Sequence, residues 1–273
     1  MCNRKLAEGS LGVTTVLGIR FSLAGVLLIG LLAARQQPLL PAKGERIRAL
    51  LLGAIGYTAE STLFFMGLER GTAAAATLLF YAYPSIVTGL EVVAGRHRMD
   101  RRTITALGLS AGGILLVVAG GGNVAISTTG IICSLGAALA FALYFITSDR
   151  LLHRTDALTT AAWVALGAGL SFALRGLVTG NLRVPHEHWN LLIVNGVATA
   201  VAFTLMFAAL HRLGPSRTSV IMTLEAFFAV VLSAVLLDES IGVLQALGGV
   251  AILAAAVLVS SARQPVAVVA PEP

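Results

Sequence analysis

The sequence predicts an all-α integral membrane protein with about nine transmembrane helices, and its composition is the first reason. Of the 273 residues, 57% are hydrophobic and only 12% are charged. A soluble domain carries about a quarter charged residues, because water must wet its surface. The charged residues also fall in short runs between long apolar stretches, so we expect most of the surface to face lipid.

The apolar stretches have the length of membrane-spanning helices, which need about 20 mainly apolar residues. The segments that qualify are 12–33, 49–68, 72–94, 104–121, 128–148, 158–179, 190–210, 217–237 and 242–261. The run Gly120–Asn123, followed by Ser127, predicts a turn and a helix start between the fourth and fifth segments. Pro84 lies inside the third segment, where we expect it to kink the helix.

Lysine and arginine predict how the chain crosses the membrane, because cytoplasmic loops carry an excess of them. One set of alternate loops, with the C-terminal tail, holds 13 of the 19 basic residues; the opposite set holds Arg4, Lys5, Arg70 and Arg183. We therefore expect the C-terminus and a disordered tail, 264–273, on the cytoplasmic side of a plasma or inner membrane. No nucleic-acid-binding motif accompanies the net charge of +6, so nucleic acid is not an expected partner.

An internal duplication organises the chain. Shifted by 142 residues, the second segment matches the seventh at Thr62/Thr204, Leu63/Leu205, Phe65/Phe207, Leu68/Leu210 and Arg70/Arg212. Matches elsewhere keep a similar offset, so we predict two repeats, over residues 1–122 and 123–263. The first repeat has four segments and the second has five, so the first helix of repeat one is expected to be missing. Copies of a five-helix unit insert with opposite orientation, as in secondary transporters.

Several motifs resemble the EamA-type family of the drug/metabolite transporter superfamily. They are Phe207–Arg217, Leu224–Ala229 and Leu237–Ser240 for its eighth to tenth helices, Ile19–Phe21 with Ala24 for its second, and Tyr83–Pro84 for its fourth. The resemblance covers essentially the whole chain. It implies two five-helix repeats and secondary active transport, by alternating access, of small metabolites, amino acids or drugs. The lipid bilayer and a small-molecule substrate are then the partners.

The chain departs from the family pattern at two motifs. Where the family has Glu-Pro in the ninth helix, this chain has Glu225 followed by Ala226. Where the first repeat of the family has an acidic residue after Leu-Gly, this chain has Arg96. A truncated, inactive paralogue or a non-transporting membrane subunit is therefore the alternative function.

Ionisable residues inside the predicted spans are the first candidates for a transport site. A charge at the centre of a membrane helix costs about 2.5–3.5 kcal/mol, so such residues mark function by default. Arg20 and Glu60 lie at a similar depth in consecutive segments. We expect that they pair or that Glu60 titrates in a central cavity; the alternative is a protonated Glu60 that only packs. Glu91 and Arg175 lie near span ends, where we expect Arg175 to reach water and Glu91 to reach water or Arg96.

Glu225 lies about eight residues into its span, at the repeat position of Tyr83. A carboxyl group in this place suits binding of a substrate or a proton. Tyr81, Tyr83 and Thr223 offer hydroxyl groups to the same cavity. Hydrogen bonding between helices is the preferred interpretation of these three residues, and contact with a polar substrate is the other.

No motif predicts an enzyme, a metal site or a cofactor. The five histidines, at 97, 153, 186, 188 and 211, all fall in loops or at span ends. His186 and His188 flank Glu187 without a third cluster of ligands nearby. The phosphate-binding loop of ATPases is also absent from the sequence, so ATP is not an expected cofactor.

Two pairs of small residues predict faces where helices approach closely. They are Gly108 with Gly112, and Gly136 with Ala140. Small side chains let the backbones of membrane helices come near each other. We expect these faces to serve packing inside the chain, and a homodimer through them is the alternative.

Overall fold

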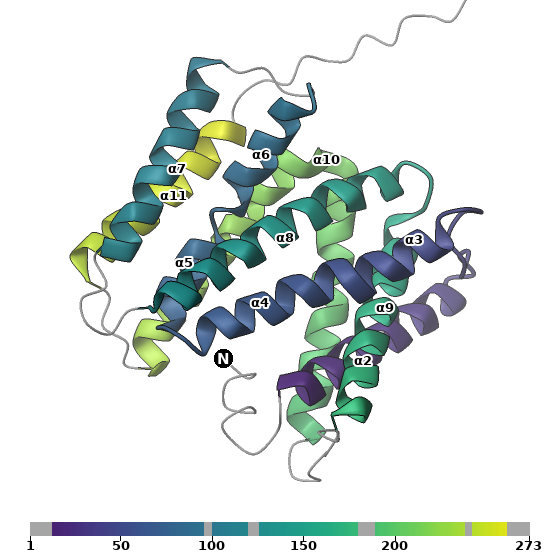
Figure 1. Cartoon of the computed structure of the whole chain (residues 1–273). Helices are drawn as coiled ribbons and strands as arrows, with labels where there is room; N and C mark the ends of the chain where they lie inside the picture. Colours follow the sequence, from purple (N-terminus) through teal and green to yellow (C-terminus); the bar gives the residue numbers. More distant parts are fainter. Residues whose placement is uncertain (1–12, 96–99, 120–125, 180–188, 238–241, 261–273) are drawn as a thin grey trace, which may run out of the picture.

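The computed structural model describes residues 13–95, 100–119, 126–179, 189–237 and 242–260 (Figure 1). Every regular element in these ranges is a helix, which confirms the all-α fold class. In chain order they are α2 (Val13–Ala34), α3 (Arg46–Leu51), η1 (Leu52–Tyr57), α4 (Thr58–Leu68), α5 (Ala73–Phe80), α6 (Tyr83–Val93), α7 (Arg101–Ala119), α8 (Thr128–Leu152), α9 (Ala157–Val178), α10 (Trp189–Leu237) and α11 (Val243–Ser260).

Six stretches of the described chain are long and apolar enough to cross a membrane. They are Thr14–Ala34, Arg46–Leu68, Ala75–Val93, Thr128–Leu152, Ala157–Val178 and Trp189–Pro215, and each coincides with a predicted segment. The other three predicted segments are also helical, in α7, in α10 beyond Gly214 and in α11. Several helices of membrane-crossing length and composition are thus confirmed, while the number nine and the opposite orientation of the repeats stay predictions.

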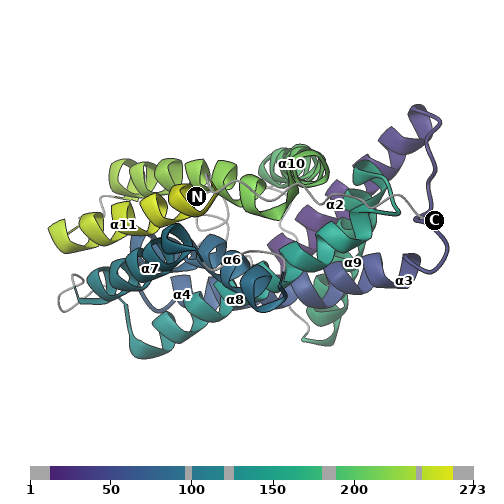
Figure 2. The ribbon, with the colours of Figure 1, turned by 90° about the horizontal axis from the view of Figure 1, so that it is seen from above.

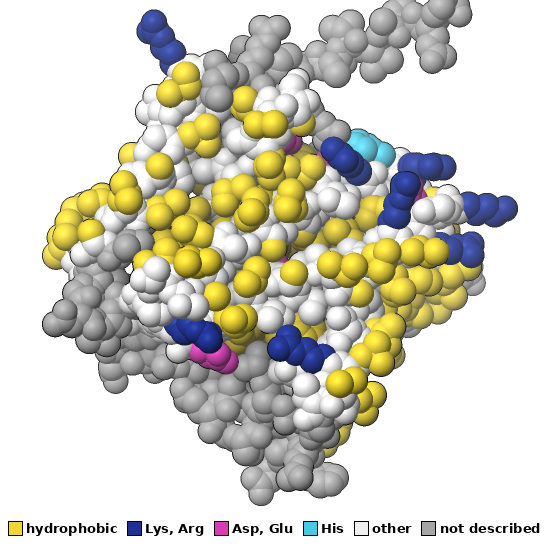
Figure 3. All heavy atoms as spheres, viewed as in Figure 1, with side chains coloured by type: hydrophobic (Ala, Val, Ile, Leu, Met, Phe, Trp, Pro, Cys, Tyr) yellow, Lys and Arg dark blue, Asp and Glu magenta, His cyan; other side chains and the backbone are white. Residues whose placement is uncertain are grey.

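The outer surface is largely apolar, as contact with lipid requires. Large apolar side chains such as Leu115, Ile132 and Val194 are each at least 65% exposed. Hydrophobic side chains spread across the face in Figure 3, and the basic side chains visible there lie toward its edges. Lipid tails are as apolar as leucine, so this exposure carries no penalty in a bilayer.

Side-chain caps begin several of the described helices, among them α5, α8 and α9. The hydroxyl of Ser127 accepts a hydrogen bond from the backbone N–H of Gly130 at 3.2 Å, and Thr72 and Asp156 cap α5 and α9 in the same way. Such caps satisfy N–H groups that have no partner within the helix. The helix start that was predicted at Ser127 is confirmed, whereas the run Gly120–Asn123 lies outside the described residues.

The third predicted span is two helices. α5 ends at Phe80, Tyr81 and Ala82 lie between the helices, and α6 begins at Tyr83 with Pro84 in its first turn. A proline lacks the N–H group that a helix interior needs but a first turn does not. The expected kink within one helix was therefore wrong in detail, because Pro84 starts a new helix.

A break at Gly214 divides α10 into two straight parts. Gly214 has φ 74° and ψ 174°, and Pro215 follows it. This positive φ is accessible to glycine at little cost, and proline then starts the next helix. The break falls between the seventh and eighth predicted segments and separates Phe203 from Glu225.

α2 packs along α9, and α7 packs along α11, in both views of the ribbon (Figures 1 and 2). α4 packs against α8, and η1 against α9. The tightest approach joins η1 to α9. A Cβ atom at Gly53 would collide with the carbonyl oxygen of Val164, and one at Gly167 with that of Leu50. Only glycine permits this backbone contact, which holds η1 in place.

The predicted packing of Gly108 and Gly112 against a helix of the same chain was wrong, while a homodimer through this face stays a prediction. A Cβ atom added at either position would meet nothing within 4 Å. The close contact of α7 uses the next glycine instead, since a Cβ at Gly113 would lie 2.7 Å from the carbonyl oxygen of Gly248 in α11. The small residues of α7 predicted helix packing, but only the tertiary structure determines which side of the helix meets the partner.

Candidate functional site

The helix that holds Glu60 changes its hydrogen-bond pattern one turn earlier. α3, η1 and α4 are continuous, and Leu52–Tyr57 form a π-helical turn. A π-turn inserts extra backbone into a helix, is rare, and is frequent at functional sites. Tyr57 is its last residue and lies three positions before Glu60, so both project from neighbouring positions on the helix.

Tyr57 is the centre of an aromatic cluster drawn from four elements. Its ring centroid lies 5.0 Å from Phe21 in α2, 5.4 Å from Tyr144 in α8 and 5.1 Å from Phe203 in α10. All three pairs meet edge to face, the arrangement that the charge distribution of aromatic rings favours. The ring of Tyr57, with its hydroxyl group, therefore lies where helices from both predicted repeats meet.

Arg20 lies beside this cluster. Its guanidinium carbon is 4.6 Å from the centroid of the Phe21 ring, a cation–π contact. The guanidinium also lies within the electrostatic range of the Tyr57 hydroxyl. The Nε atom is buried and has no hydrogen-bond partner among the described residues.

Two carboxyl groups lie within the electrostatic range of Arg20, and each comes from a different predicted repeat. Glu60 in α4 is only 6% exposed and accepts a hydrogen bond from the hydroxyl of Ser61 at 2.9 Å. Glu225 in α10 is exposed and interacts electrostatically with Tyr81. The two carboxyl groups also influence each other. One basic and two acidic groups therefore share one region among the helices.

The remaining predicted site residues have separate positions. Tyr83 donates a hydrogen bond to the backbone carbonyl of Ser219 at 3.2 Å, which ties α6 to α10. Its ring packs edge to face against Phe141, at 4.8 Å between centroids. Tyr83 thus has the interhelical role that the sequence favoured. The side chain of Thr223 lies outside the described part of the structure.

Two charged residues at predicted span ends differ in their exposure to solvent. Arg175 is exposed, as expected, and its Nη1 atom lies 3.5 Å from the hydroxyl of Thr62. Glu91 is 6% exposed, so it does not reach water, and its other expected partner, Arg96, lies outside the described residues. Glu91 is buried because its helix, α6, packs against α8, α10, α11 and α7.

Tyr57 was not among the site residues expected from the sequence. A tyrosine in an apolar span is commonly an interfacial anchor, so its residue type alone gave no signal. Its spacing to Glu60 was the available clue, since residues three apart share a helix face.

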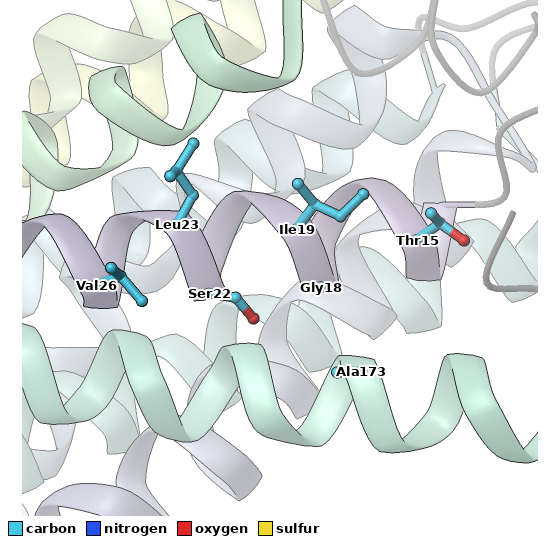
Figure 4. A pocket seen from close by; sticks show the side chains of 7 residues that line it. All are labelled: Thr15, Gly18, Ile19, Ser22, Leu23, Val26 and Ala173. Atoms are coloured by element: carbon cyan, nitrogen blue, oxygen red, sulfur yellow. The ribbon is translucent and has the colours of Figure 1, made fainter. Parts of the chain in front are cut away.

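A separate groove of about 350 Å³ runs along α2 (Figure 4). Its lining is Thr15, Gly18, Ile19, Ser22, Leu23, Val26 and Ala173. Figure 4 shows Ser22 directed toward α9, with Ile19 and Leu23 on the other side of α2. None of the charged candidates lines this groove, so it is not the site that they form.

Several apolar membrane-length helices with charged side chains clustered among them are typical of membrane transport proteins. The chain belongs to the EamA-like transporter family, whose model matches residues 1–119 and 128–261. It is a multi-pass membrane protein, as the family and the helices together show.

Two relatives agree with this membership, and a solved structure shares the fold. The chain is 27% identical over 225 residues to the uncharacterized inner membrane transporter YicL of Salmonella typhimurium, covering 79% of this chain and 73% of that protein. It is 25% identical over 217 residues to the uncharacterized transporter YcbK of Bacillus subtilis, covering 76% and 69%. One solved crystal structure matches with a TM-score of 0.66 at 17% identity, over 94% of this chain and 91% of the other, and shows the fold alone.

Proposed function

We propose that the chain is a secondary active transporter that moves a small metabolite, amino acid or drug across the plasma or inner membrane by alternating access. The observation that supports this most is the grouping of Arg20, Glu60 and Glu225 among apolar helices. Each of these charges is costly inside a membrane unless a partner or a polar cavity compensates it. Their common position is therefore explained best by a binding site.

The architecture of this transporter is two inverted repeats, residues 1–122 and 123–263, with the C-terminus and the tail 264–273 in the cytoplasm. The two stretches that match the family support this division. Glu60 belongs to the first repeat and Glu225 to the second. In transporters built from inverted repeats, the substrate binds between the repeats near the midplane of the bilayer, and the two repeats move relative to each other.

Within this site, the carboxyl groups of Glu60 and Glu225 bind a positive group of the substrate or exchange protons with it. Tyr81 orients Glu225, with which it interacts electrostatically. Tyr83 braces α6 against α10, and Thr223 is a further candidate on the same helix as Glu225.

Transport by the purified chain in liposomes tests the proposal. The wild-type protein is expected to move at least one member of a panel of metabolites, amino acids and drugs under an imposed proton or solute gradient. Glu60→Gln and Glu225→Gln keep the shape of each side chain and remove its charge, so both should reduce the rate strongly. Glu69→Gln is the control, because Glu69 is an exposed residue at the end of α4.

The opposite result is equally informative. A folded wild-type protein that moves no member of the panel would overturn transport and favour the non-transporting membrane subunit. Equal rates for Glu60→Gln, Glu225→Gln and Glu69→Gln would leave transport standing but remove the two carboxyl groups from the site.

A further inference from the structure

The segment that joins α2 to α3, residues 35–45, is held against α9 although it lies outside any helix. The hydroxyl of Thr159 donates a hydrogen bond to the backbone carbonyl of Pro38 at 3.0 Å. The indole N–H of Trp163 donates a hydrogen bond to the carbonyl of Leu39 at 2.9 Å. These two bonds give the segment a defined path along α9, so its exposed side chains form a fixed surface.

The segment lies at one end of the apolar part of the helix bundle. The membrane-length stretch that contains α2 ends at Ala34, the following stretch begins at Arg46, and α9 begins at Ala157. Trp163 lies within the first two turns of α9, so the segment folds back along this helix toward the apolar part. Tryptophan is enriched at the level of the lipid headgroups, and we place the segment at this level of the bilayer.

The segment and the helix that follows it expose large apolar side chains. Leu39 and Leu40 are 43% and 49% exposed, and Ile47 in the first turn of α3 is 71% exposed. Apolar side chains gain nothing from contact with water. At the headgroup level they reach the acyl chains of lipids, as the apolar faces of interfacial segments do.

Basic side chains accompany these apolar ones, and Figure 3 shows Lys and Arg side chains gathered along the edge of the molecule where α3 lies in Figure 1. Arg48 and Arg154 both pair with the buried carboxylate of Glu45, at 3.1 and 3.8 Å. Three other basic residues are exposed and form no ion pair within the part of the chain that the structure describes; they are Arg35, Lys43 and Arg46. The charge of these three residues therefore favours an anionic ligand.

We propose that the segment, together with the first turn of α3, is a binding site for an anionic phospholipid of the surrounding bilayer. The three unpaired basic side chains bind the negative headgroup, while Leu39 and Leu40 contact the acyl chains. A zwitterionic lipid has no net charge with which to compensate three cations. A soluble anion would pair with the cations but leave the leucines exposed. The inference requires only that the helices span a bilayer, and it goes beyond the proposed function.

Tryptophan fluorescence tests this site directly. The chain has two tryptophans, and Trp189 begins α10, so the full chain with Trp189→Phe reports on Trp163 alone. The protein is reconstituted in phosphatidylcholine vesicles with rising fractions of brominated phosphatidylglycerol or, in parallel, of brominated phosphatidylcholine. Bromine quenches a tryptophan that it contacts. We expect half-maximal quenching at a roughly fivefold lower fraction of phosphatidylglycerol, the change in affinity that one basic residue contributes at an anionic membrane surface.

The variants separate a defined site from general attraction between charges. Arg35→Gln combined with Lys43→Gln removes two of the three charges and should abolish the preference for phosphatidylglycerol. Arg101→Gln combined with Arg102→Gln is the matched control, because both residues are exposed at the start of α7 and are expected on the same side of the membrane. This control should keep the preference. Leu40→Ser leaves every charge in place but removes an apolar contact, so it should raise the fraction at half-maximal quenching roughly twofold or more.

Each outcome decides the inference. Equal quenching by the two brominated lipids would overturn it, and so would an equal loss of preference in the two double variants. Inorganic phosphate that relieves the quenching more than chloride does at equal ionic strength would place a free anion in the site and overturn it as well.

A measurement without these variants covers the case in which Arg35→Gln with Lys43→Gln fails to fold. Raising the ionic strength from about 0.01 M to about 1 M shortens the Debye length from about 30 Å to about 3 Å. Loss of the preference for phosphatidylglycerol at high ionic strength supports the inference, whereas an unchanged preference overturns it.

Discussion

The contact between η1 and α9 yields a sharp prediction about stability. In Gly53→Ala, the new Cβ atom would collide with the carbonyl oxygen of Val164 and lie 2.9 Å from the backbone nitrogen of Ala168. Both are backbone atoms, so no side-chain rotation relieves the clash. Overpacking of this kind costs about 1–3 kcal/mol, and the upper end applies where the backbone itself has to move.

The higher helix propensity of alanine partly offsets this loss of stability. Replacing glycine by alanine within a helix stabilises it by about 1 kcal/mol. The difference leaves Gly53→Ala destabilised by about 2 kcal/mol. For a chain of this size that corresponds to a melting temperature lower by about 4–8 °C, on the scale established for soluble domains.

Gly56→Ala is the matched control, because Gly56 belongs to the same π-turn. Its added Cβ would meet Leu52 Cδ1 at 3.4 Å and Tyr144 Cδ2 at 3.5 Å, which are ordinary contacts with side chains. Its stability should equal or exceed that of the wild type. Thermal unfolding of the purified protein in detergent, followed by circular dichroism or loss of monodispersity, compares the two variants. Equal melting temperatures would refute the reasoning about the η1–α9 contact.

The other predictions concern single polar contacts. Tyr83→Phe removes the bond to the Ser219 carbonyl, and should destabilise the protein by about 1 kcal/mol in thermal unfolding while transport continues. Tyr81→Phe removes the hydroxyl that interacts with Glu225, and should raise KM in the liposome assay while lowering the stability by no more than Tyr83→Phe does; an unchanged KM would contradict the role of Tyr81. Asp156→Ala removes the cap of α9, and should cost about 0.5–2 kcal/mol, whereas the neighbouring exposed Arg154→Ala should cost less.

Much of the site could be predicted from the chain of residues. Charges inside long apolar segments are costly wherever they fall, so Arg20, Glu60 and Glu225 could be identified as site candidates from the sequence. Tyr81 and Tyr83 were candidates because their hydroxyl groups can face the same cavity. Their different partners, Glu225 and Ser219, could not be predicted, because hydrogen bonds between helices depend on how each helix is rotated.

The position of Tyr57 and the choice of interhelical glycines could not be predicted from the sequence pattern. The π-turn at Leu52–Tyr57 has no sequence signature that separates it from ordinary α-helix. Gly108 and Gly113 are equally small, yet only Gly113 meets another helix. Composition identifies small residues, whereas the rotation of a helix determines which of them touch a neighbour.

The sequence by itself determined that this protein is a helical membrane protein, because apolar length and the scarcity of charge leave the chain no other stable environment. It also determined which residues are costly there, and its motifs indicated the family. The tertiary structure alone decided that Arg20, Tyr57, Glu60 and Glu225 share one region. Those contacts join α2, η1, α4 and α10, and only packing in three dimensions brings such distant segments within the range of charge and hydrogen bonds.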